Sequence, residues 1–525
     1  MNQKVQSGSD SSAYTTDYKA GQDNVQVMGM DVLNPVFGTS AFAILAFIVL
    51  ALIFPADAKE VLVGARTWSI ETFDWLFMIG GNIFVLFCLL MIILPVGKIR
   101  LGGSQAKPDF NRMSWFSMLF AAGMGIGLMF WSVAEPVAYY TDWWGTPLNA
   151  APNTPEGASA AMGATMFHWG LHPWAIYGVV ALALGFFTYN KGLPLTIRSA
   201  FYPLLGERVW GPIGHVIDIV AVLATIFGLA TSLGLGASQA AGGLNFLFGV
   251  DNNISTQIAI IIAVSAIAIF SVIRGLDGGV KVLSNINMMI AAVLLLFVIV
   301  AGSITAFFGN LFGTIGSYAS DIIPLSNWIG REDEKFYTGW TVFYWAWWVS
   351  WSPFVGMFIA RVSRGRTVRE FMTAVLLIPT LVSAVWMSAF GAGALDQIQN
   401  NVGELTKGVG DVSLAMFHML ENLPLVELTS ILAIVLVLVF FITSSDSGSL
   451  VIDSITAGGK VDAPVPQRIF WAVLQGVIAG VLLYGGGSEA LTALQAGAIT
   501  TGLPFTVILL LMCVSLYKGL KSELR

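Results

Sequence analysis

The sequence predicts an all-α membrane protein that crosses the bilayer many times. Of its 525 residues, 56% are hydrophobic and only 11% are charged, whereas about 25% of the residues of a soluble domain are charged. Apolar runs of about 20 residues, enough for a helix to cross a bilayer, recur along the chain between short polar loops. The two cysteines, Cys88 and Cys513, lie in apolar runs and offer no disulfide framework.

We expect one membrane helix from each of twelve apolar segments. These are 36–55, 72–96, 113–140, 160–189, 211–247, 256–273, 284–309, 337–360, 370–393, 425–448, 468–486 and 493–517. Residues 1–35 are polar and contain no apolar core of a signal peptide, so they predict a disordered cytoplasmic tail, and 518–525 form a second, short one. The acidic external loop 326–335 (SNWIGREDEK) is expected to open a short surface helix.

Basic residues predict the orientation of the chain. If both termini lie inside, 20 of the 25 Lys and Arg residues lie on that side; the outside keeps Lys59, Arg66, Arg331, Lys335 and Lys407. Cytoplasmic loops carry the excess of Lys and Arg in membrane proteins, so we expect both termini in the cytoplasm. The densest basic patch, 361–369 (RVSRGRTVR), is expected to be part of this topology signal, with contact to anionic lipid or to a regulatory tail as the alternative.

The segment 340–358 (WTVFYWAWWVSWSPFVGMF) holds five of the 17 tryptophans and no charge. On a helix, Tyr344, Trp347, Trp348 and Trp351 share one face. Aromatic faces attract a cation that cannot donate a hydrogen bond, above all a quaternary ammonium group. The alternative is an interfacial aromatic belt, which needs only one or two such residues at a helix end.

The segment 113–140 contains glycine at Gly123, Gly125 and Gly127. Each costs about 0.8–1 kcal/mol relative to alanine in a helix. We therefore expect an unwound stretch whose free backbone groups can hold a cation or a substrate. Close helix packing through small residues is the alternative.

A second aromatic cluster is predicted near the start of 160–189, where Trp174 and Tyr177 are helical neighbours and Trp169 can reach the same side. His168 and His172 have a spacing that can bind metal. However, the sequence shows no HExxH pattern or third ligand nearby, so we expect packing histidines.

The inner end of 425–448 is rich in oxygen ligands. Hydroxyls of Thr443 and Ser444, the carboxylate of Asp446 and freed carbonyls would suit Na⁺; hydroxyls bonded back onto their own helix are the alternative. Asp446 is an ionisable group within a membrane helix and is functional by default. Glu135 and Asp218 are similar cases in weaker contexts.

Three stretches together resemble the betaine/carnitine/choline transporter (BCCT) family: GMGIGLMFWSVAEP (123–136), HWGLHPWAIY (168–177) and WAWWVSWSPFVGMFIARVSRGRTVREF (345–371). The resemblance implies two peripheral helices (36–112) and two inverted five-helix repeats of the leucine-transporter type, 113–336 and 337–517. The glycine-rich 113–140 and the proline-interrupted 337–360 would be their first helices. It also implies a homotrimer in a bacterial inner membrane.

The resemblance also implies site residues. An aromatic box would consist of Trp169, Trp174, Tyr177 and Trp351, with substrate contacts from Met124, Gly125 and Gly127 and pathway aromatics at Phe130, Trp347 and Trp348. A sodium site would use carbonyls of Ala121, Met124 and Phe440 and hydroxyls of Thr443 and Ser444. A second sodium site matches at Thr225 and Phe354, but Leu229 stands where the family has threonine, with Thr231 or Ser232 as substitutes.

The implied function is import of a quaternary-ammonium or sulfonium zwitterion, glycine betaine or dimethylsulfoniopropionate, coupled to Na⁺ by alternating access and serving osmoprotection. The all-glycine stretch favours a zwitterion, since choline-type members tend to carry an acidic residue there. A proton-coupled choline transporter and a sodium-independent carnitine/betaine exchanger are the alternatives. An intramembrane enzyme would need a nucleophile with a base or a metal cluster, and a channel would need a repeated filter motif; the sequence suggests neither. We expect no cofactor besides the coupling ion and no nucleic-acid partner.

Overall fold

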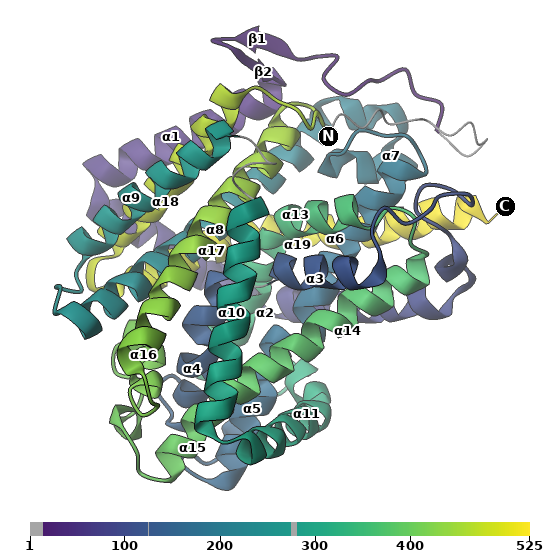
Figure 1. Cartoon of the computed structure of the whole chain (residues 1–525). Helices are drawn as coiled ribbons and strands as arrows, with labels where there is room; N and C mark the ends of the chain where they lie inside the picture. The colour runs from purple at the N-terminus through teal and green to yellow at the C-terminus, as the bar shows by residue number, and fades with distance from the viewer. Residues whose placement is uncertain (1–13, 124, 275–280, 525) are drawn as a thin grey trace.

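The computed structural model describes residues 14–123, 125–274 and 281–524, which form a bundle of long helices (Figure 1). Both described ends meet at one residue. The Tyr14 N–H donates to the carbonyl of Lys191 (3.3 Å), and Nζ of Lys191 pairs with Glu523 (2.5 Å). The two described ends of the chain therefore lie at the same end of the bundle.

All twelve segments are helical over most of their length. The helices are α1 (Asn34–Ile53), α2 (Pro55–Ile93), α3 (Arg112–Gly123), α4 (Ile126–Tyr140), α5 (Pro155–Trp169), α6 (Leu171–Tyr189), α8 (Pro212–Phe248), α9 (Ile254–Arg274), α10 (Lys281–Gly302), α11 (Ile304–Ser326), α13 (Val342–Val362), α14 (Val368–Met387), α15 (Gly393–Gln399), α16 (Ala415–Leu420), α17 (Val426–Thr456), α18 (Val465–Gly486) and α19 (Ala490–Glu523). In the described part of the chain, ten helical stretches are long and apolar enough to cross a membrane. The segments 113–140 and 337–360 are not among the ten, because the first is divided between α3 and α4 and the second is rich in Trp, Tyr and Ser.

The irregularities of two helices differ from expectation. The helix 113–140 is interrupted at its glycines, as predicted. In contrast, α13 runs through Pro353 without a break. The irregular part of the segment 337–360 is instead a π-helical turn, η6 (Tyr337–Thr341), which directly precedes α13. The segment 160–189 was expected to be one helix and is divided at Gly170 into α5 and α6.

The helix α11 was not expected. The segment 284–309 ends at Gly302, and Ser303 caps a new 23-residue helix that packs against α5. It buries one narrow stripe, Phe307, Thr314, Tyr318 and Leu325, which makes it amphipathic. The loop 326–335 does open a short helix, the three-residue α12 (Glu334–Phe336), while the long helix α11 precedes the loop.

The prediction that all of 1–35 is a disordered tail was also wrong. Residues 1–13 lie outside the described part, but β1 (Val25–Val27) and β2 (Met30–Val32) form a hairpin at the end of the bundle opposite α11, α15 and α16 (Figure 1). Tyr18 stacks on Trp210 at 4.2 Å, and Asp31 pairs with Lys460. These contacts anchor the segment.

The helix α13 forms the core of the bundle. Every residue from 341 to 357 is buried, and the helix packs against α6, α8 and α19. A helix that is buried on all sides needs neighbours all round, so its aromatic side chains are surrounded by protein.

Candidate functional site

The aromatic residues of α13 lie in a continuous row. Trp347 and Trp348 are stacked, with ring centroids 4.8 Å apart and planes at 13°. Tyr344 lies 5.7 Å from Trp348 on one side, and Trp351 lies 6.4 Å from Trp347 on the other. The helical spacing of the sequence thus brings these four rings together.

The break at Gly170 sets the ends of α5 and α6 beside this row. A Cβ atom at Gly170 would lie 2.7 Å from the hydroxyl oxygen of Tyr318, so only glycine fits. The same hydroxyl accepts the free N–H of Leu171 at 2.9 Å. Tyr318 of α11 therefore closes over the break, with Trp169 on one side of it and Trp174 on the other.

Three of the four predicted box residues are linked through Trp348. Trp169 lies 4.9 Å from Trp348, Tyr177 lies 6.2 Å from it, and Trp174 packs edge-on against Tyr177 at 5.5 Å. Trp351, the fourth, reaches the group only through Trp347, and its indole N–H donates to the carbonyl of Gly228 at 3.0 Å.

The glycine stretch forms another wall of this cluster. Gly125 is extended between α3 and α4, and a Cβ atom there would lie 3.4 Å from Cη2 of Trp351. A Cβ atom at Gly127 would lie 2.6 Å from Cη2 of Trp347 and 3.0 Å from Cη2 of Trp169. Both glycines therefore lie against indoles of the cluster, while their predicted contact with a substrate stays a prediction. Met124 lies outside the described residues.

The pathway aromatic Phe130 is placed differently. It packs edge-on against Trp131 at 4.8 Å, and Trp131 in turn packs against Trp340 at 5.1 Å. Phe130 therefore joins the rings at the N-terminal end of the α13 row.

Glu135 is the polar centre of the cluster, and sequence reasoning underestimated it. Its side chain is fully buried, and its carboxylate accepts hydrogen bonds from the hydroxyls of Tyr139 (2.8 Å) and Tyr344 (2.5 Å) and from Nε1 of Trp169 (2.7 Å). Nδ1 of His168 lies 2.8 Å from the same carboxylate. The available signal was a lone acidic residue within an apolar segment, which marks a functional site by default.

The two histidines are packing residues, as the sequence suggested. Nε2 of His168 lies 3.0 Å from the hydroxyl of Thr341, while its ring stacks on Tyr344. His172 stacks on Trp345 at 5.0 Å and contacts the side-chain amide of Asn82.

Part of the predicted sodium site lies together on α17. The Thr443 hydroxyl donates to the carbonyls of Val439 (3.0 Å) and Phe440 (3.2 Å), and Ser444 is buried one residue further on. The hydroxyl of Thr443 is therefore bonded back onto its own helix, which is the arrangement considered as the alternative to an ion site. Ala121 lies near the C-terminal end of α3, and Met124 is outside the described residues. Carbonyl and hydroxyl oxygens are hard ligands, a donor set that fits Na⁺.

The predicted second sodium site is incomplete. The Thr225 hydroxyl donates back to Ala221 at 2.7 Å, and Phe354 packs against Trp351 at 5.5 Å. Leu229 fills the space against α17, where a Cβ atom at Gly448 would lie 2.3 Å from its Cδ1.

The hydroxyls considered as substitutes for that site are already bonded. Thr231 donates to the carbonyls of Phe227 (2.9 Å) and Leu494 (2.8 Å), and Ser232 donates to Gly228 at 3.4 Å.

The two other carboxylates that the sequence singled out, Asp446 and Asp218, are buried and bonded to neighbouring side chains. Asp446 accepts from Ser271 at 2.6 Å, and Asp218 pairs with Arg198 at 3.2 Å and accepts from Thr196. Asp446 is thus bonded to α9, and no contact of it with Thr443 or Ser444 is seen in the described part of the chain.

Comparisons with known proteins agree with the motifs. The family model described as "BCCT, betaine/carnitine/choline family transporter" matches residues 35–525. The chain is 65% identical to glycine betaine transporter 1 of Vibrio parahaemolyticus over 97% of this chain and 98% of the relative. It is 63% identical to a glycine betaine/proline/choline/ectoine transporter of the same organism over 97% of this chain and 91% of the relative.

More distant similarities were also found. A glycine betaine transporter of Bacillus subtilis is 43% identical over 91% of this chain and 93% of the relative. Among solved structures, a mutant manganese transporter of Eremococcus coleocola aligns with a TM-score of 0.43 at 14% identity, covering 80% of this chain and 83% of that one; this likeness is too low to carry an argument.

Proposed function

The chain belongs to the betaine/carnitine/choline family of transporters, and on that premise we propose that it imports a quaternary-ammonium zwitterion, glycine betaine first, together with Na⁺. The observation that carries the proposal is the approach of Gly127 to the indole edges of Trp169 and Trp347. The backbone of α4 and two indole rings lie together there, and these are the kinds of group that a zwitterion with a methylated cation needs.

The two ends of such a substrate have different partners. The quaternary ammonium group would lie among the box indoles, and each cation–π contact is worth about 0.5–2 kcal/mol. The carboxylate would lie at the N-terminus of α4, where Gly125 is extended and no side-chain cap is seen among the described residues, so the first N–H groups of the helix can bind an anion. Glu135, the carboxylate that contacts this row from α4, is already bonded to four side chains, so we infer that the substrate supplies its own negative charge.

Sodium coupling is proposed on the oxygens of α17. Thr443 would turn from its own helix toward the ion, joined by Ser444 and the carbonyls of Phe440, Ala121 and Met124. One ion per substrate is favoured, because Leu229 offers no oxygen for a second site and the hydroxyl of Thr231 is engaged by Leu494.

Alternating access would come from rocking of 113–336 against 337–517 around the aromatic box. We further propose that the protein functions as a homotrimer in the bacterial inner membrane with both termini in the cytoplasm. The excess of Lys and Arg on the side of the termini supports the orientation.

The test is uptake of radiolabelled glycine betaine into proteoliposomes with and without an inward Na⁺ gradient. Choline, carnitine and dimethylsulfoniopropionate serve as competitors. Uptake that needs Na⁺ and resists choline supports the proposal, whereas uptake without Na⁺ would indicate proton coupling or exchange. Strong competition by choline would favour a broader substrate range, like the one in the name of the 63% identical relative.

Trp351→Ala should abolish uptake, while the exposed Trp68→Ala serves as the matched control.

A further inference from the structure

A polar cavity of about 270 Å³ lies between the two halves of the chain, away from the aromatic box. The end of α10 and the first turns of α11 form one wall, and the π-helical turn η7 (Ser388–Ala392), α15 and the end of α16 form the other. Figure 1 places α11, α15 and α16 at the end of the bundle opposite the N-terminal hairpin. In the proposed orientation this end faces the outside.

The wall formed by α10 attracts positive charge. The helix ends at Gly302, because Ser303 turns the chain with a φ of +131°. The last carbonyls of a helix have no partner within it and carry a partial negative charge that favours a cation. Ile299, Ala301 and Gly302 of this last turn line the cavity, and no Lys, Arg or His is found among the described residues around it.

The opposite wall adds a full negative charge and an unpaired hydroxyl. Asp396 of α15 lines the cavity and accepts a hydrogen bond of 2.6 Å from the amide of Asn310, but no ion-pair partner for it is seen in the described part of the chain. Ser388 of η7 also lines the cavity; it is buried, and its hydroxyl has no partner among the same residues. Unpaired buried polar groups are unfavourable, so both indicate a ligand with hydrogen-bond donors and a positive charge.

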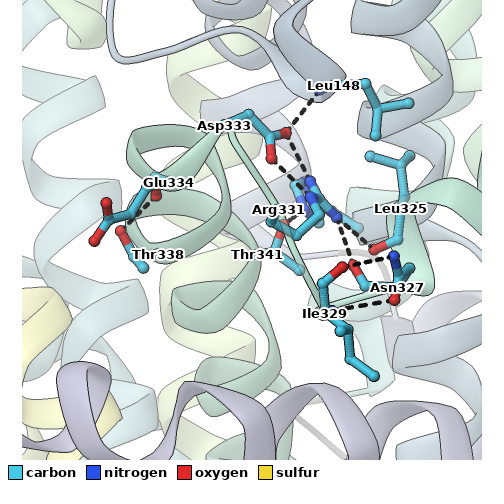
Figure 2. A network of polar contacts seen from close by, with 10 residues as sticks. Leu148, Leu325, Asn327, Ile329, Arg331, Asp333, Glu334, Thr338 and Thr341 are labelled. Atoms are coloured by element: carbon cyan, nitrogen blue, oxygen red, sulfur yellow. Dashed lines mark hydrogen bonds and ion pairs between the residues drawn. The ribbon is translucent and has the colours of Figure 1, made fainter.

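The helix α11 is held in place at its other end. Figure 2 shows Arg331 bonded to both carboxylate oxygens of Asp333 (2.7 Å each) and to the carbonyls of Leu325 and Asn327 (3.0 Å each). Leu325 belongs to the last turn of α11, so the guanidinium group satisfies the C-terminal end of this helix. Asp333 also accepts the N–H of Leu148 at 2.7 Å. These bonds fix the helix whose first turns form the cavity wall.

The cavity adjoins an exposed apolar surface. Val293, Leu296 and Val300 of α10 are each more than half exposed and share one face of the helix, which leads to the cavity. Ile304 and Phe308 of α11 are also about half exposed, beyond the turn at Ser303. In a membrane protein such a surface contacts acyl chains. A molecule with apolar chains on this surface and a cationic group in the cavity is a membrane lipid, whereas a bare metal ion would leave most of the volume to water.

The start of α11 supplies the opposite charge. Ser303, which lines the cavity, accepts the N–H of Ala306 at 3.3 Å. Among the described residues, no acceptor is found for the N–H groups of Ile304 and Thr305. Free N–H groups at a helix N-terminus bind phosphate. The rim of the cavity therefore suits an anion and its interior suits a cation, which matches a zwitterionic headgroup.

We propose that this cavity binds the headgroup of an outer-leaflet lipid with a primary ammonium group, phosphatidylethanolamine. The ammonium group donates to the carboxylate of Asp396 and to the carbonyls at the end of α10, and the phosphate lies at the N-terminus of α11. A choline headgroup has no N–H to donate, so the site distinguishes the two lipids. The bound lipid joins 113–336 to 337–517 at the outer end of the bundle. This inference is independent of which substrate the protein transports.

The experiment counts lipids bound to the purified full-length protein by native mass spectrometry. The protein is titrated with phosphatidylethanolamine, its N-methyl and N,N-dimethyl derivatives, and phosphatidylcholine, all with the same acyl chains. In the wild type we expect the affinity to fall about tenfold along this series, because the N–H donors to a carboxylate are lost one by one. Asp396→Asn should bind all four lipids equally. Asp321→Asn, a change to an α11 carboxylate that accepts from Ser320 and does not line the cavity, is the matched control and should keep the preference.

Three results would overturn the lipid site. They are equal binding of phosphatidylethanolamine and phosphatidylcholine by the wild type, an unchanged preference in Asp396→Asn, and a preference that depends on which alkali cation is present at constant ionic strength. The last result would assign Asp396 to a metal ion instead. The wild-type series is decisive even if Asp396→Asn does not fold.

Thermal unfolding gives a second readout. Phosphatidylethanolamine should raise the unfolding temperature of the wild type and of Asp321→Asn more than phosphatidylcholine does, because a ligand of the folded state stabilises it. In Asp396→Asn the two lipids should have the same effect. Equal effects of the two lipids on the wild type would contradict the proposal.

Discussion

Nε1 of Trp169 donates a hydrogen bond of 2.7 Å to Oε2 of Glu135 inside the bundle. A buried carboxylate on α4 thus fixes the orientation of the last indole of α5. The same oxygen accepts the hydroxyl of Tyr344 at 2.5 Å, so the neighbouring helices α4 and α5 are joined at one atom to α13, which lies far along the sequence.

Glu135→Gln is expected to reduce kcat/KM for uptake about 10–100-fold. Glutamine keeps the size but has one carbonyl oxygen and one NH₂ group, so the donors at one of the two positions lose their acceptor: either Trp169 and Tyr344 at Oε2, or Tyr139 and His168 at Oε1. A bond to a charged group contributes about 1.5–3 kcal/mol. Uptake kinetics in proteoliposomes, corrected for the amount of inserted protein, measure the effect. Tyr139→Phe, which removes a single donor, should lose less, and normal uptake by Glu135→Gln would refute a positioning role.

Gly127→Leu is expected to abolish uptake while insertion into the membrane persists. Its side chain would occupy the space between the indoles of Trp347 and Trp169, where even a Cβ atom approaches to 2.6 Å. Gly64→Leu is the control, because a Cβ atom there meets nothing within 4 Å. Binding of glycine betaine and uptake are measured together, and wild-type affinity in Gly127→Leu would place the substrate elsewhere.

Thr443→Val is expected to raise the Na⁺ concentration for half-maximal uptake about tenfold. The substitution keeps the shape of the side chain and removes one hard oxygen ligand of the proposed ion site. Thr429→Val is the matched control, because its hydroxyl also bonds back onto α17 but near the opposite end of the helix. If both variants respond to Na⁺ as the wild type does, the ion is not bound at Thr443.

Tyr318→Phe is expected to destabilise the folded protein by about 1–3 kcal/mol, because the N–H of Leu171 loses its acceptor at a buried helix break. Thermal unfolding of the purified protein in detergent measures the change. Tyr484→Phe removes the hydroxyl of an exposed tyrosine and should not lower the unfolding temperature. An equal temperature for Tyr318→Phe and the wild type would show that water replaces the hydroxyl.

The periodicity of the sequence was sufficient to predict structural features that lie within a single segment. The spacing of Tyr344, Trp347 and Trp348 predicted their common face, and the alternate glycines predicted the interruption before Ile126. Both follow from helix geometry and backbone preference, which act over a few residues.

Features that depend on distant partners were missed. The role of Glu135 depends on donors from α5 and α13, and the division at Gly170 depends on the hydroxyl of Tyr318 in α11. The order of residues 14–33 likewise depends on docking, since a polar segment that reads as disordered gains Trp210 and Lys460 as partners. Such contacts have no local signature in the sequence.

Trp347 and Trp348, whose rings are nearly parallel at 4.8 Å, are also a pair of coupled chromophores. Their electronic transitions mix at this separation, and the resulting near-ultraviolet circular dichroism depends on the angle and distance between the rings. A ligand that parts the two indoles changes that signal without any label. If the substrate binds at this pair, as proposed, near-ultraviolet circular dichroism would report its arrival without a label.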